Sequence, residues 1–257
     1  IAEEAPLQLA DLFRSSRQVE REEFKRFAGG IHVRHPAIQA LVWAPRIPRS
    51  QLAAHERGVR AEGFQDYAVF ELDADGRHVP VAAREAYFPT SHVYPAAGNE
   101  AAFGFDIGSE AMRRAALEEA HRSRSLVVSE RVRLVQEQET QYGVLVVSPH
   151  FDASGAELLG HTLSVVRIGQ LIETALRDTA RGGLVYQLLA LGAHGDDPLL
   201  YASARPAQAV MPLSIEHLSS EINPQFASIV SASEVVVVCP FRIEFEGGGG
   251  QMHGGEF

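Results

Sequence analysis

Residues 87–129 read YFPTSHVYPAAGNEAAFGFDIGSEAMRRAALEEAHRSRSLVVS and hold the strongest structural signals in the chain. They place one acid, Asp106, among apolar residues, continue into an alanine-rich segment that predicts a helix, and end in a short run that predicts a strand. A carboxylate in an apolar neighbourhood is costly unless hydrogen bonds satisfy it. A bound small molecule with N–H groups can provide those bonds, and so can the backbone of a turn that Asp106 caps. Both interpretations of Asp106 are open at this point.

The segments on either side complete the prediction of the fold class. Ser109 can cap the alanine-rich helix, Glu110 complements the positive end of the helix dipole, and we expect the helix to end near Ser123. Before it, the turn at residues 73–76 (DADG) separates two β-rich segments. After it come two further predicted strands, LVVSERVRLV and YGVLVVSPHF. This order predicts a small antiparallel sheet with helices to one side, an α+β fold.

Residues 5–27 predict one long amphipathic helix that ends at Gly29 and Gly30. Its thin apolar stripe has two interpretations. The stripe packs on its own domain, or it also meets a second copy of the chain. The apolar residues that form it, at mostly helical intervals, are Leu9, Leu12, Phe13, Val19, Phe24 and Phe27.

A second unit with a similar order of elements is expected from residue 152 onward. It has a turn, the strand LLGHTLSVV, the amphipathic helix RIGQLIETALRDT and at least three further strands. The glycine-rich end of the chain cannot pack a core and predicts a flexible tail. The expected domains are therefore a helix at 1–30, a first sheet domain at 31–151, a second sheet domain at 152–246 and a tail at 247–257.

Composition narrows the classes of partner. The 257 residues carry 23 Lys and Arg against 33 Asp and Glu, a formal charge of −10. Such an excess of acid disfavours a phosphate-binding surface, so we expect neither nucleic acid nor anionic lipid as a partner. The single cysteine, Cys239, excludes an intramolecular disulfide and a cysteine-clustered zinc site. No window approaches the roughly 18 consecutive apolar residues of a membrane span.

Catalytic and cofactor motifs are not found in the sequence. No segment fits a Walker phosphate loop, a dinucleotide fingerprint, a zinc-protease helix, an EF-hand or a nucleophile elbow. The loop at 194–197 (HGDD) contains residues that can bind a metal ion, but a tight turn explains this sequence better. Asp106 with His92 or His150 could act as acid and base, yet no nucleophile accompanies them at a recognisable spacing. We therefore expect no enzyme, no cofactor and no metal.

Six short segments follow one another in a recognisable order. They are FKRF at 24–27, PAIQALVWAPRIP at 36–48, AREAYFP at 83–89, GFDIGSEAMRRAALEEA at 104–120, VVSERVRLV at 127–135 and YGVLVVSPHF at 142–151. Their order and spacing resemble the CHASE domain, the extracytoplasmic sensor module of bacterial receptor kinases and diguanylate cyclases and of plant cytokinin receptors. The likeness covers about residues 24–151.

The resemblance implies a long N-terminal stalk helix followed by two PAS-like antiparallel-sheet domains, of which the one farther from the membrane binds the ligand. It also implies a periplasmic location, a membrane helix on each side of these residues, a cytoplasmic output domain, and a homodimer that forms through the stalk helix. Against this receptor function stand two alternatives, a dimerisation scaffold that binds no ligand and, less favoured, a hydrolase.

The resemblance also implies ligand contacts. Asp106 falls on the acidic position that accepts hydrogen bonds from an adenine-type ring in cytokinin-binding members, so the expected ligand is adenine-like or another flat N–H donor. Val128 falls where the backbone of the neighbouring strand meets that ring. For each aromatic residue considered, ordinary core packing is the favoured alternative. The complete set of expected ligand-binding residues is Asp106, Val128, Tyr87, Phe88, Phe103, Phe105, Glu139 and Thr140.

Overall fold

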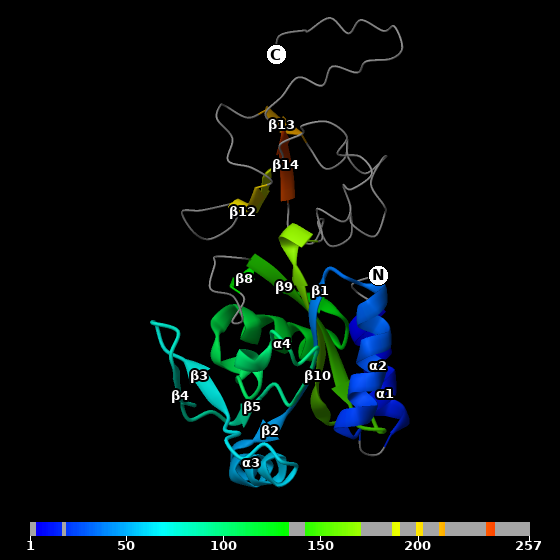
Figure 1. Ribbon diagram of the computed structural model, residues 1–257, viewed down its shortest axis with the longest axis vertical. Helices are drawn as coiled ribbons and strands as arrows, with labels where there is room; N and C mark the ends of the chain where they lie inside the picture. The colour runs from blue at the N-terminus through cyan, green and yellow to red at the C-terminus, as the bar shows by residue number, and fades with distance from the viewer. Residues whose placement is uncertain are drawn as a thin grey trace, which may run out of the picture.

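The computed structural model describes residues 4–16, 19–133 and 142–170, and the four strands 187–190, 199–202, 211–213 and 235–239. Figure 1 shows helices and antiparallel sheet combined in these parts of the chain, which confirms the predicted mixture of helix and antiparallel sheet. The predicted loop at 194–197, most of the helix predicted at 167–179, and the tail lie outside the described residues. Among the described helices, none has the length and apolar character needed to cross a membrane.

A central antiparallel sheet organises the first part of the chain. Its strand order is β6-β1-β10-β9-β7, and β8 also pairs with β9. Val42 on β1 lies opposite Leu163 on β10, which lies opposite Val147 on β9. These three residues are buried, so the core runs through the centre of the sheet. The strands are β1 (Ile38–Pro45), β6 (His92–Tyr94), β7 (Val127–Val128), β8 (Val132–Arg133), β9 (Tyr142–Phe151) and β10 (Leu158–Arg167).

Strand β10 lies between β1 and β9 in this sheet, whereas the sequence predicts it in the second unit. Strands β9 and β10 form a hairpin whose turn contains Asp152, which accepts from the backbone N–H groups of Ala156 and Glu157. A domain boundary at 151/152 would cut this hairpin. The second sheet, β12-β11-β14-β13, contains β11 (Gln187–Ala190), β12 (Leu199–Ala202), β13 (Met211–Leu213) and β14 (Val235–Cys239).

The N-terminal segment forms two helices, α1 (Glu4–Ser15) and α2 (Arg21–Arg34), so the prediction of one helix over 5–27 was wrong. Helix α1 ends at a serine pair, where Ser15 Oγ donates to the Leu12 carbonyl and Ser16 Oγ to Glu23. Such local bonds give the backbone an alternative to helix. Arg34 Nη2 donates to Gln8 Oε1, joining the end of α2 to the start of α1. The two helices therefore form an antiparallel pair.

Helix α2 continues through Gly29 and Gly30, which were expected to stop it. A Cβ at position 29 would lie 3.1 Å from the hydroxyl oxygen of Tyr94 and 3.2 Å from its ring. Gly29 therefore lets α2 approach strand β6 closely, a packing role that sequence does not reveal.

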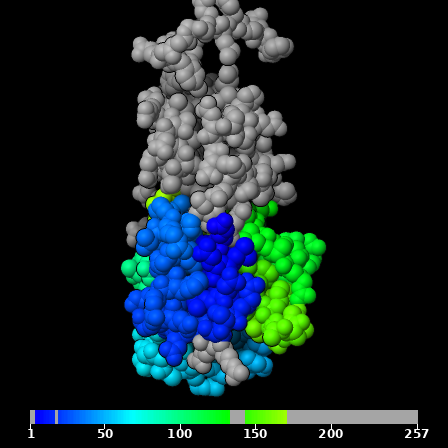
Figure 2. All heavy atoms as spheres, turned by 90° about the vertical axis from the view of Figure 1, so that its right-hand side faces the viewer, coloured from blue at the N-terminus to red at the C-terminus, as the bar shows by residue number. Residues whose placement is uncertain are grey.

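Helices α1 and α2 cover one face of the central sheet, and Figure 2 shows them side by side on one side of the molecule. Most of their apolar stripe points inward: Leu9 and Phe24 are almost fully buried, whereas Phe27 is exposed. The ring of Phe13 stacks on Trp43 of β1 with centroids 4.2 Å apart. Of the two interpretations of this stripe, packing on its own domain is therefore observed.

The opposite face is covered by α4 (Ala111–Ser123), so the prediction of helices on one side only was wrong. Leu117 and Ala120 of α4 pack against Leu145 and Val147 of β9. The reason for two covered faces is that β1 is buried at successive positions instead of alternating, and from Ala40 to Ala44 these positions are all apolar. The cap of α4 is Glu110, which accepts from the N–H groups of residues 112 and 113; the predicted cap, Ser109, does not serve this role.

Short elements extend the α4 side. The predicted turn at 73–76 is confirmed: Asp73 Oδ1 accepts from the backbone N–H groups of Asp75 and Arg77. This turn joins β3 (Phe70–Leu72) to β4 (His78–Pro80). The remaining elements here are β2 (Ile47–Pro48), the 3-10 turn η1 (Arg49–Gln51), α3 (Leu52–Ala61), β5 (Ala86–Tyr87), and the 3-10 turns η2 (Glu100–Ala102) and η3 (Ile107–Ser109).

Candidate ligand site

Asp106 lies between two strands and immediately before the turn η3. Its backbone N–H donates to the Phe70 carbonyl at 2.8 Å, and the N–H of Ile107 donates to the Phe88 carbonyl at 3.0 Å. The segment is therefore fixed to β3 on one side and to the end of β5 on the other. The residue is 0% exposed, so its carboxylate points into the protein.

The two carboxylate oxygens of Asp106 have different partners. Oδ1 accepts from the backbone N–H of Phe88 at 2.8 Å and of Gly108 at 3.1 Å. Oδ2 accepts from Nη1 of Arg84 at 3.2 Å. The first oxygen caps the turn η3 and joins it to β5, as the turn-capping interpretation predicts. The second oxygen is held by the Arg84 side chain, which can move without breaking the backbone hydrogen bonds to Oδ1.

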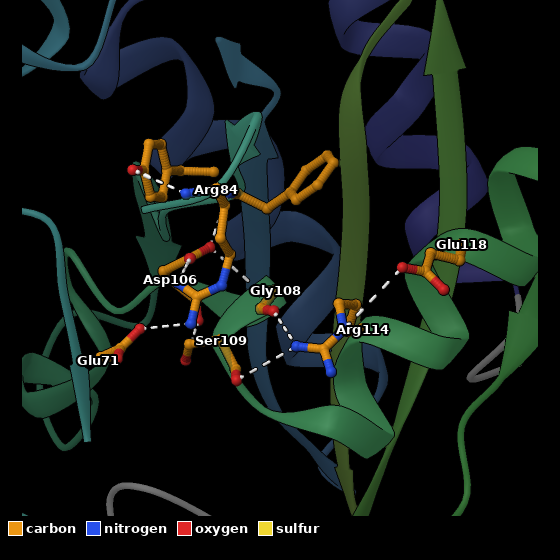
Figure 3. A network of polar contacts seen from close by, with 9 residues as sticks. Glu71, Arg84, Asp106, Gly108, Ser109, Arg114 and Glu118 are labelled. Atoms are coloured by element: carbon orange, nitrogen blue, oxygen red, sulfur yellow. Dashed lines mark hydrogen bonds and ion pairs between the residues drawn. The ribbon is translucent and has the colours of Figure 1, made fainter. Parts of the chain in front are cut away.

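Arg84 bridges two carboxylates, as Figure 3 shows. Its Nη2 donates to Glu71 Oε2 at 2.6 Å while Nη1 reaches Asp106. Burial raises the pKa of Asp106, and the bonds from Phe88, Arg84 and Gly108 act in the opposite direction. Because desolvation is the largest of these effects, the carboxylate is held at a cost in free energy and gains from any cationic N–H donor beside Oδ2.

The other half of the network joins the Asp106 turn to helix α4 (Figure 3). Arg114 Nη1 donates to the Gly108 carbonyl at 3.1 Å, and its Nε lies 4.0 Å from Glu118 Oε1. Ser109 Oγ donates to the Asp106 carbonyl at 2.6 Å. The Asp106 turn is therefore hydrogen-bonded directly to α4.

A sequence model of the CHASE domain matches residues 17–201, most of the chain. The chain therefore belongs to the CHASE-domain family. The match confirms the likeness noted from the six segments and extends it beyond residue 151. CHASE domains are extracytoplasmic sensor modules.

Two further comparisons are narrower. An extracellular ligand binding receptor from Desulfohalobium retbaense DSM5692 is similar in structure with a TM-score of 0.47 and 12% identity, over 83% of this chain and 32% of that one. The flagellar motor switch protein FliM of Pseudomonas aeruginosa is 56% identical over 46 residues. That match covers 18% of this chain and 14% of FliM, so the chain spans a small part of both proteins.

Three of the aromatic residues expected in the CHASE ligand site do surround the Asp106 segment. Tyr87 is buried, and its hydroxyl accepts from the backbone N–H of Arg84 at 3.3 Å. Phe88 is half-buried and meets the His161 ring edge-on at 5.2 Å. Phe105 is buried against Phe70 in the core. These contacts also fit ordinary core packing.

Phe103 and Val128 lie away from this group. Phe103 packs 4.9 Å from Tyr67 and 5.0 Å from Phe64, and it lines an open hollow of about 860 Å³ beside β3 and β4. Asp106 is not among the residues that line this hollow. Val128 pairs with Val146 at the edge of the central sheet and is half-buried. The other two expected residues, Glu139 and Thr140, lie outside the described residues.

A second polar cluster joins α2 to α3. Arg21 donates to Glu62 at 2.6 Å and to the Ser91 carbonyl at 2.8 Å. The Nε2 of His55 lies 3.0 Å from the hydroxyl of Tyr67, whose pKa burial raises to about 12. The cluster borders a hollow of about 670 Å³ between these helices and β6.

Sequence reasoning missed Arg84, the side chain that donates to Asp106 Oδ2, and Glu71, the carboxylate that holds Arg84 in place. Arg84 stands inside the AREAYFP segment, which was noted only as a family signature. Its partners lie 13 and 22 residues away along the chain, and no local pattern links them. The only signal was a cation inside a half-apolar β segment.

Proposed function

We propose that this CHASE domain is the ligand-sensing part of a bacterial transmembrane receptor and that a small molecule binds on the α4 side of the first sheet, at Asp106. The observation that carries this proposal is the buried carboxylate whose Oδ2 accepts from the Arg84 side chain while Oδ1 is used by the backbone. An apolar surrounding with one such acceptor favours a flat ligand with N–H donors.

The architecture supports the PAS-like form of the ligand-binding domain. In the central sheet the first and last strands, β1 and β10, are neighbours, with β6 on the other side of β1 and β9 on the other side of β10. The Asp106 turn and α4 lie together on one face of this sheet, where a ligand would contact both.

Signalling requires that a ligand bind two states of the domain with different affinity. In this proposal the Asp106 turn and α4 shift together on binding. The helices α1 and α2 pair with those of a second copy and carry the change toward membrane helices and an output domain, a kinase or a diguanylate cyclase, beyond these residues. Phe27 and Val33 of α2 are exposed to 38% and 82% and are available for that contact.

The test is a thermal-shift and calorimetric screen of the chain against purines, amino acids, amines and small carboxylates, with native mass spectrometry for a co-purified molecule. We expect a saturable ligand whose affinity falls at least roughly tenfold in Asp106→Asn, since one lost charge-assisted bond is worth about 1.5–3 kcal/mol. The control is Asp11→Asn on the exposed side of α1, which should bind as the wild type does. An affinity of Asp106→Asn equal to that of the wild type would show that the ligand does not bind at Asp106.

A further inference from the structure

We infer that Asp106 and Glu71 together form a binding site for a flat cation of the guanidinium or amidinium class, and that the Arg84 side chain fills this site in the present structure. The inference deepens the proposed function, on which it rests, because it names a second carboxylate and the charge of the ligand.

The geometry of Arg84 is that of a bound guanidinium ligand. Two of its nitrogens each donate to a different carboxylate, at 3.2 Å to Asp106 Oδ2 and at 2.6 Å to Glu71 Oε2. A free guanidinium or amidinium ion presents the same planar pair of N–H groups. Such an ion could therefore replace the side-chain head group with both bonds kept.

The charges at the site select a cation over a neutral ring. With Arg84 withdrawn, two carboxylates face one position, and like charges in a partly buried space repel. A neutral N–H donor such as a purine would leave both negative charges uncompensated. A planar cation compensates one of them and donates to both, which is the reason for preferring the guanidinium class.

The site can be reached from solvent through Arg84. The side chain of Arg84 is 23% exposed and that of Glu71 is 18% exposed, whereas that of Asp106 is 0% exposed. The guanidinium therefore lies on the outer side of Asp106. Residues 81–84 have no regular secondary structure, and the backbone of Arg84 is held separately by its bond to the Tyr87 hydroxyl. The side chain can leave while its backbone stays in place.

The experiment uses the whole chain with Arg84→Ala, titrated with methylguanidinium chloride at low millimolar concentration. Sodium chloride and methylammonium chloride at equal ionic strength serve as ion controls. We expect the variant to unfold at a lower temperature than the wild type and to recover with saturation on methylguanidinium, more than on either control salt. Arg114→Ala, which removes the other arginine of Figure 3, should show no such recovery.

Two further arms make the result decisive. In Arg84→Ala combined with Glu71→Gln the recovery should weaken at least roughly tenfold in apparent affinity, because one of two charge-assisted bonds is lost. Wild type should bind methylguanidinium at least tenfold more weakly than Arg84→Ala, since a ligand must first displace the side chain. Should Arg84→Ala be insoluble, Arg84→Gln is purified with and without 10 mM methylguanidinium, and a higher folded yield with it supports the inference.

The inference is overturned if methylguanidinium leaves the melting temperature of Arg84→Ala, or the folded yield of Arg84→Gln, the same as the control salts do. Arg84 would then be a structural ion pair. That failure is separate from failure of the proposed function, which the wild-type ligand screen and Asp106→Asn test.

Discussion

The central sheet buries polar groups on its two faces in different ways. Under α1 and α2 the polar groups are mainly uncharged: the half-buried His92 and the buried His150 lie against the ring of Phe13, and burial lowers the pKa of both. The α4 side also buries a histidine, His161, whose pKa burial lowers to about 3, but there the sheet core adjoins a charged chain, Glu71–Arg84–Asp106. Uncharged rings can pack against any apolar surface, whereas a buried carboxylate needs hydrogen-bond donors at specific positions. The first arrangement serves stability, and the second leaves a group that a ligand can contact.

The largest effect should come from breaking the charged chain at its buried end. Asp106→Ala leaves the N–H groups of Phe88 and Gly108 without their acceptor and removes one partner of Arg84. We expect a loss of about 3–5 kcal/mol in the free energy of unfolding by urea. The exposed Asp11→Ala should change it by less than about 0.5 kcal/mol. Similar losses in both variants would contradict the role given to Asp106.

A somewhat smaller loss should follow from a cavity on the other face. Leu9 of α1 is 0% exposed, and Leu9→Ala should cost about 3 kcal/mol. The measurement is urea unfolding at several protein concentrations. Because α1 packs on its own sheet, the loss should not depend on concentration. A loss that vanishes on dilution would show that Leu9 belongs to a contact between two copies. Leu7→Ala, on the exposed side of the same helix, is the matched control.

Two groups on opposite faces of the sheet, His92 and Asp106, should respond to acid with opposite signs. Burial lowers the pKa of His92 to about 4 from 6.5, so the unfolded chain binds more protons than the folded one between these values. Its contribution to stability is present above pH 6.5 and is lost as the pH falls toward 4. Asp106, whose pKa is raised, contributes in the other direction, because protonation relieves the cost of its buried charge.

We therefore expect His92→Phe to reduce the loss of stability between pH 6.5 and 4.5 by roughly 1–2 kcal/mol, measured by urea unfolding across the pH series. Asp106→Ala should steepen the same loss. An unchanged pH profile in His92→Phe would show that this histidine is protonated alike in both states.

The smallest effect is expected at the cluster that joins α2 to α3. Arg21→Ala removes the pair with Glu62 and the bond to the Ser91 carbonyl, and the guanidinium also lies 4.4 Å from the Phe64 ring. Since Glu62 is half-exposed, we expect about 1 kcal/mol in thermal or urea unfolding. Arg21→Lys should recover little of it, because a lysine cannot bond both partners in one plane. Full recovery in the lysine variant would mean that charge alone matters.

The elements with local signals were predicted well. Asp73 and Gly76 form the expected turn because both act on neighbouring backbone, and α4 ends at Ser123 as predicted. The long helix was predicted wrongly because periodicity continues across a break when both pieces pack on the same sheet. Strand β10 was assigned to the second unit because β-pairing partners are non-local: Leu163 meets Val42 across 121 positions of chain, a pairing that no window contains.

The sequence alone determined the family, the turn chemistry and the presence of one acid among apolar residues, since each depends on residue order or on neighbours a few positions apart. Only the tertiary structure decided what satisfies that acid. Arg84 reaches Asp106 from one segment and is itself held by Glu71 from another, and hydrogen bonds of about 3 Å depend on how strands and turns are brought together in space. The same folding turned α1 and α2 against their own sheet, because burial of apolar area depends on the surface available and not on helical spacing.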